Sequence, residues 1–211
     1  EPIMGGNGIR VVPQTPISLE IGDIVRVKGT VIESGANVAE CYLDAYANGI
    51  ERTGYTLLPS PVGMSTKFVA TGAFGLQQAL YSDTIATPPI VGAGLSPVGT
   101  RVRVWGRVTW KSQDSTSFFV NDGFNLKSSY AGDERTGIRL LYPIDCPGTY
   151  EVQDYVNGVT GVLGAEMTTE TPILPVPVVR IPCAVQGRII HVKSDSPGPT
   201  FDGKTWDTAY H

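Results

Sequence analysis

The sequence predicts an all-β protein, made of two tandem five-stranded barrels or sandwiches with an extra strand at each end. Three observations support this prediction. The 211 residues include 25 Gly and 16 Pro, which occur throughout the chain and disfavour long helices. Several segments alternate apolar and polar residues with the period of a β-strand. Finally, the second half of the chain repeats the first.

The internal repeat begins where 22–31 matches 99–108 without a gap. The same register aligns 41–44 with 118–121 and Asn48 with Asn125. After a short insertion in the second copy, three further pairs of segments follow in the same order: 51–54 with 134–137, 57–58 with 140–141, and 71–75 with 160–164. So many matches in one order indicate a duplication.

The first strand of each copy, at 22–31 and 101–109, has the clearest strand pattern. Gly29 and Gly106 occupy the same position, where a glycine lets a strand bend around a small barrel. If the repeat is structural, Val25 and Val102 should both be buried and the two glycines should mark the same bend. In the second copy the alternation leaves four polar or aromatic side chains on the outer face: Arg101, Arg103, Trp105 and Arg107.

The remaining strands follow in order along each copy. The second strands are expected at 38–43 and 117–120, and the turn-forming residues 121–123 end the latter. The third strands are expected at 54–58 and 137–142. The fourth and fifth strands are expected at 67–74 and 90–91 in the first copy, and at 154–163 and 176–181 in the second.

Five short strands, with a glycine-bent first strand and a turn after the second, resemble the OB-fold, the oligonucleotide/oligosaccharide-binding barrel. The resemblance covers 22–97 and 99–190 and concerns the fold alone. It implies a ligand face on the second and third strands. Prolines interrupt the interval where the family has a helix, so an incomplete barrel or a related β-sandwich stays open. The candidate ligand-binding residues for single-stranded nucleic acid or an oligosaccharide are Arg101, Arg103, Trp105, Arg107, Phe119 and Tyr130.

The two ends of the chain do not fit the repeat. Residues 9–13 resemble the last strand of a copy, at 178–182, and 185–190 resemble the opening strand, at 104–109. We therefore divide the chain into a leader with an orphan strand (1–21), repeat one (22–97), repeat two (98–184) and a partial repeat (185–211).

An orphan strand must pair, fold back or stay disordered, because its N–H and C=O groups need partners. Addition to the sheet of a neighbouring copy would satisfy them and would build an open filament if the rotation does not close. Pairing within the same chain is the alternative. The expected assembly residues are Ile9, Val11, Val12, Ile189 and Ile190.

Charge and composition bear on the expected partners and location. A net charge of −4 and a pI near 5.2 do not favour a dedicated nucleic-acid binder. No apolar run reaches the roughly 18 residues of a membrane-spanning helix, so membrane insertion is not expected. Low charge and abundant Thr, Ser and Gly are typical of secreted or cell-surface β-proteins. Cys146 and Cys183 could form a disulfide, or all three cysteines could be buried thiols.

The sequence contains no arrangement typical of catalysis. Its two histidines, His191 and His211, allow no Ser-His-Asp or Cys-His set, so no enzymatic activity and no cofactor are expected. Asp122, Asp133 and Glu134 fit a solvated acidic loop better than a cation site, so no metal is expected either. The leading hypothesis is a secreted or cell-surface structural protein that polymerises with itself, head to tail, by strand addition. The alternative is a binding module for single-stranded nucleic acid or a glycan.

Overall fold

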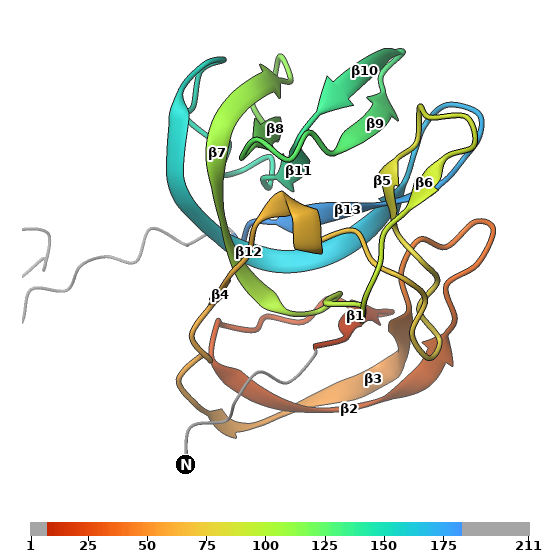
Figure 1. Cartoon of the computed structure of the whole chain (residues 1–211). Helices are drawn as coiled ribbons and strands as arrows, with labels where there is room; N and C mark the ends of the chain where they lie inside the picture. The colour runs from red at the N-terminus through yellow and green to blue at the C-terminus, as the bar shows by residue number, and fades with distance from the viewer. Residues whose placement is uncertain (1–7, 183–211) are drawn as a thin grey trace, which may run out of the picture. The chain divides into compact units, whose positions relative to one another are not determined.

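The structure, a computed structural model, describes residues 8–182. These residues contain strands and one short 3-10 helix but no α-helix, so the predicted all-β class is confirmed (Figure 1). The elements are β1 (Arg10–Pro13), β2 (Asp23–Ile32), β3 (Tyr42–Tyr55), β4 (Val62–Gly63), η1 (Thr66–Phe68), β5 (Tyr81–Asp83), β6 (Ile90–Val91), β7 (Arg101–Lys111), β8 (Ser117–Asn121), β9 (Lys127–Tyr130), β10 (Asp133–Thr136), β11 (Ile138–Leu141), β12 (Tyr155–Met167) and β13 (Pro175–Arg180).

Repeat two forms a closed ring of five strands. The order is β7-β8-β11-β13-β12, and β12 pairs back onto β7. All neighbours are antiparallel except β11 and β13, which are parallel. This ring, green to blue in Figure 1, encloses the main hydrophobic core. Its largest fully buried side chains include Phe118, Ile138, Leu140 and Leu163.

The alternation predicted for the first strand of repeat two is confirmed. On β7 the three valines Val102, Val104 and Val108 are fully buried. The side chains between them face outward and are half-buried or exposed. Period-two patterning thus identified both faces of this strand, because one face lines a dry core.

Repeat one forms an open sheet instead of a second ring. Its strands β2 and β3 make a long antiparallel hairpin, and β1 adds to β3 in parallel, which gives the order β1-β3-β2. The later strands of repeat one pair with repeat two: β4 pairs with β7, and β5 pairs with β9. The two repeats consequently belong to one compact unit that extends to Ile181.

The two repeats share part of their strand pairing. Thr30 pairs with Asp44 as Arg107 pairs with Asn121, and these positions are equivalent in the ungapped alignment. Gly29 and Gly106 both lie where the neighbouring strand approaches so closely that a Cβ would overlap a backbone carbonyl. The two glycines therefore occupy equivalent positions of close strand approach, as the ungapped alignment predicts.

Val25 departs from the expected burial. It is half-buried, whereas Val102 is fully buried. The reason is that Val102 lines the closed core of the ring, whereas Val25 lies on an open three-stranded sheet.

The predicted strand at 67–74 is wrong. This segment begins with η1, where the Ser65 side chain accepts a hydrogen bond from the Lys67 amide. Both the amide and the hydroxyl of Thr66 donate to Asp122 on the ring. These hydrogen bonds hold the segment in a tight turn against repeat two. They outweigh the preference of its valine and aromatic residues for an extended strand.

Candidate assembly site

Glu40 lies at the junction of the open sheet and the ring. Its side chain is only 4% exposed and precedes β3. One carboxylate oxygen, Oε2, accepts hydrogen bonds from Arg180 Nη1 and from the Ala165 amide, each at 2.8 Å. The other oxygen, Oε1, accepts one from Arg10 Nη1 at 3.3 Å. Donors on β13, β12 and β1 therefore converge on one buried negative charge, which compensates its loss of hydration.

The charges continue beyond Glu40 as an alternating row. Arg180 Nη2 lies 3.8 Å from Glu166, and Arg139 Nη1 lies 2.9 Å from the same carboxylate. Arg139 also donates to the Tyr130 hydroxyl at 3.1 Å and stacks 4.0 Å from the centre of its ring. Each cation in the row faces an anion or an aromatic ring, so the network links β1, β13, β12, β11 and β9.

Strand β1 is held entirely by residues distant in sequence. It pairs in parallel with β3, in a register that places Arg10 beside Tyr42 and Val12 beside Asp44. Just before the strand, the Gly8 amide donates to the Gly99 carbonyl at 3.0 Å. By contrast, the connection from β1 to β2, residues 14–22, is exposed from Gln14 to Ile21.

Cavities flank β1 on the side of the ring. One of about 530 Å³ is lined by Arg10, Val12, Glu40 and residues of β12. A second of about 320 Å³ is lined by Ile9, Cys41 and residues of the ring. Two pockets that open to solvent therefore border β1. Burial, with the nearby carboxylates of Glu33 and Glu40, raises the pKa of the Cys41 thiol.

Three of the five predicted assembly residues lie at this site. Ile9 directly precedes β1 and is 48% exposed, and Val11 and Val12 are half-buried on the strand. Ile189 and Ile190 lie outside the described residues. Within the described chain, β1 pairs with its own β3, which corresponds to the intrachain alternative.

The predicted ligand-binding residues fall into two separate groups. The outward row of β7 has protein partners. Arg101 donates to the Pro59 carbonyl at 2.6 Å, Arg103 to the Asn157 carbonyl at 3.3 Å, and Arg107 to the Gln153 side chain at 3.3 Å. Trp105 is half-buried in the same row.

Phe119 and Tyr130 belong to the second group, an aromatic cluster with Trp110. The three ring centres lie 5.6–5.9 Å apart. The Arg135 guanidinium covers Trp110 at 4.7 Å, and Phe119 is 1% exposed. The three aromatic side chains pack against one another and against arginine, and Phe119 has almost no exposed face on which a base could stack.

Glu40 and Arg180 were missed by the sequence reasoning. A signal was available, because Glu40 aligns with Ser117 in the ungapped repeat, and a charged residue there directly precedes an apolar strand. The distance of Arg180 from Glu40 along the chain hid the pair. Only the topology brings β13 beside the start of β3.

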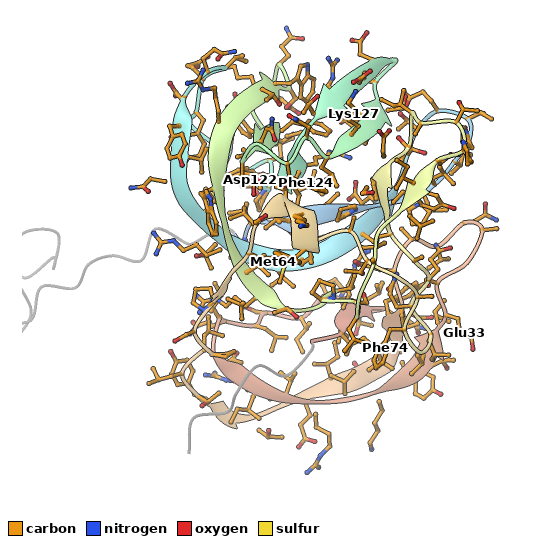
Figure 2. All side chains as sticks on the ribbon, in the orientation of Figure 1. Glu33, Met64, Phe74, Asp122, Phe124 and Lys127 are labelled. Atoms are coloured by element: carbon orange, nitrogen blue, oxygen red, sulfur yellow. The ribbon has the colours of Figure 1, made fainter. Side chains whose placement is uncertain are left out.

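Asp122 is a second polar anchor, between the ring and η1. It accepts hydrogen bonds from the Thr66 amide at 2.8 Å, from the Thr66 hydroxyl, and from the Phe124 amide at 3.2 Å. Figure 2 shows Asp122 and Phe124 beside η1, with Met64 just before that turn. Partial burial opposes ionisation of Asp122, but the hydrogen bonds from Thr66 outweigh it and lower its pKa.

We expect the substitution Asp122→Asn to destabilise the protein by about 1–2 kcal/mol at pH 7, because an amide offers one acceptor oxygen in place of two. The lowered pKa means that the ionised form stabilises the fold at pH values above the unfolded pKa, and that this stabilisation is lost as the pH falls through the folded pKa. The difference between the two proteins should therefore shrink below about pH 4. Urea unfolding at several pH values measures it. The exposed Asp145→Asn serves as the control, and an equal loss there would contradict the assignment.

Comparison of the chain with protein-family models, curated proteins and solved structures gave no significant match. Within 8–182, no three His, Cys, Asp or Glu side chains lie close enough to share a metal ion. The same residues include no helix with the length and apolar character needed to cross a membrane. Cys183, the suggested partner of Cys146, lies outside the described residues.

Proposed function

We propose that this chain is a secreted or cell-surface structural protein, without enzymatic activity, that assembles head to tail by exchange of strand β1 between copies. The observation that carries this proposal is the contrast between β1 and its connection to β2. Every contact of β1 described above is with a distant residue, while residues 14–21 of the connection are exposed.

Exchange would preserve the contacts that hold β1. The pairing with β3, the Arg10–Glu40 ion pair and the Gly8–Gly99 hydrogen bond can form equally well when the strand belongs to a neighbour. Only the path of the connection would change, and its residues 14–22 span about 30 Å when extended. Swapping an identical element is a low-cost route to oligomers, and a non-closing contact of this kind generates a filament.

The open sheet of repeat one adds support. Within residues 8–182, β1 and β2 are its edge strands, and the backbone groups along such edges favour the addition of further strands. Repeat two is, in this proposal, an OB-like barrel. The ring order β7-β8-β11-β13-β12, with parallel β11 and β13, supports that assignment. The duplication would then have left one closed barrel beside one open sheet, to which a neighbour supplies an edge strand.

We expect the double substitution Val11→Asp, Val12→Asp to abolish assembly. It places a charge on each face of β1, where both side chains are half-buried. Sedimentation velocity over a range of concentrations and electron microscopy measure the result: fibres for the native chain and soluble monomers for the variant. The matched control, Ile144→Asp with Val152→Asp, adds the same charge at exposed positions and should still assemble. A native chain that stays monomeric at high concentration would refute the proposal.

The alternative, a module for single-stranded nucleic acid or a glycan, would use the outward row of β7. That reading is less well supported, because Arg101, Arg103 and Arg107 each already donate to a protein acceptor. Stacking on a base needs an accessible aromatic face, and Phe119 is buried. We therefore favour assembly.

A further inference from the structure

We propose that Glu40 and Arg180 form a socket that selects the incoming strand by an arginine at position 10. The occupant is the N-terminal strand of a second copy of this chain. This inference rests on the proposed exchange of β1 and adds to it the residue that recognises the partner.

The socket is organised without the help of β1. Arg180 and the Ala165 amide both bind Oε2 of Glu40, so the carboxylate is fixed from the side of the ring. Oε1 remains for the strand, and Arg10 is the donor that reaches it. A strand without a donor at this position would bury a carboxylate oxygen and leave it without that hydrogen bond.

Charge also excludes the wrong strand. The groups around the position of Arg10 are the carboxylates of Glu40 and Glu166 and the guanidinium of Arg180, which both carboxylates already engage. An acidic residue at position 10 would face those carboxylates at close range. An arginine completes the alternating row, whereas a lysine supplies the charge without the planar fork of donors.

The arginine further fixes the register of the incoming strand. Successive side chains of a strand point to opposite faces, so a slip of one residue would turn position 10 away from Glu40. The neighbouring valines provide apolar contact but cannot distinguish such a slip as sharply. Arg10 itself is 53% exposed, which makes it a residue that can be changed with little effect on the rest of the fold.

Cross-linking between full-length chains tests the socket. In a background with the native cysteines replaced by serine, the donor chain carries Val12→Cys together with Glu40→Gln, so that its own socket does not select Arg10. The acceptor chain keeps Glu40 and carries Asp44→Cys, at the position paired with Val12 in the structure. A short bis-maleimide then joins donor to acceptor when β1 of one molecule lies beside β3 of another. Donors with Arg10, Arg10→Lys and Arg10→Glu are compared by yield on denaturing gels.

We expect Arg10→Glu to lower the cross-linking yield by about tenfold or more, because it removes a charge-assisted hydrogen bond to Glu40. The yield for Arg10→Lys should lie between those for Arg10 and Arg10→Glu. A donor with Gln14→Glu, which adds negative charge at an exposed position, should keep the native yield. The acceptor variant Glu40→Gln should lower the yield for the Arg10 donor and reduce the difference between donors.

The possible failures are distinguishable. Equal yields for Arg10 and Arg10→Glu donors would overturn the socket while leaving strand exchange intact. Absence of any donor–acceptor product with native Arg10 would overturn both strand exchange and the socket that rests on it.

Discussion

Replacing Glu40 with leucine is expected to lower the free energy of unfolding by about 3 kcal/mol, near the lower end of the range for breaking a buried ion pair. The loss arises because the variant keeps Arg180 but removes its carboxylate, and it leaves the Ala165 amide without its acceptor. The lower end applies because Arg180 is 29% exposed and can turn partly toward water. Urea unfolding at pH 7 measures the change.

A second variant separates the charge from the shape of the side chain. Adding Arg180→Met to Glu40→Leu removes the cation that has lost its nearer carboxylate, and it replaces the pair with apolar side chains of similar length. We expect the double variant to recover more than half of the lost stability, since apolar replacements of buried pairs are often tolerated. A double variant as unstable as the sum of its single variants would show that the pair has no energetic coupling.

Replacing Phe118 with alanine is expected to have a comparable or larger effect, about 3–5 kcal/mol, because it opens a cavity in a closed core. Phe118 is fully buried on β8, and its ring contacts Tyr142 and Tyr150 edge to face at 5.5 and 6.1 Å. The strands of the ring are joined in a closed circuit, so they can collapse little around the missing side chain. Thermal or urea unfolding checks this expectation.

Phe124→Ala is the matched control for Phe118→Ala. It is the same substitution in the same repeat, at a side chain that is 42% exposed beside η1 (Figure 2). Its effect should remain within about 0.5 kcal/mol. Similar losses of unfolding free energy for the two variants would show that Phe118 does not belong to the hydrophobic core inside the ring.

Repeat two was largely predictable from sequence because apolar and polar residues alternate clearly along its strands. The valines of β7, the apolar β8 and the glycine-bent first strand each identify a face or a bend without reference to the rest of the chain. The duplication also predicted correctly that Gly29 and Gly106 occupy equivalent positions in their sheets.

Repeat one was less predictable, because its local patterns compete with tertiary contacts. Residues 67–74 have the composition of a strand, but Asp122 on the ring binds Thr66 and holds the segment as a turn. The charge network shows the same limit. Arg10, Glu40 and Arg180 are scattered along the chain, and no periodicity relates them. Their meeting depends on the parallel pairing of β1 with β3 and on the position of β13 in the ring.

The pairing of β4 and β5 with strands of repeat two has a consequence for the order of folding. During synthesis repeat one emerges first, yet two of its strands complete their ladders only on β7 and β9, which are made later. The ring of β7, β8, β11, β13 and β12 closes without any strand of repeat one, so it can form before β4 and β5 pair with repeat two. We therefore expect repeat two to fold before repeat one, although repeat two is synthesised later.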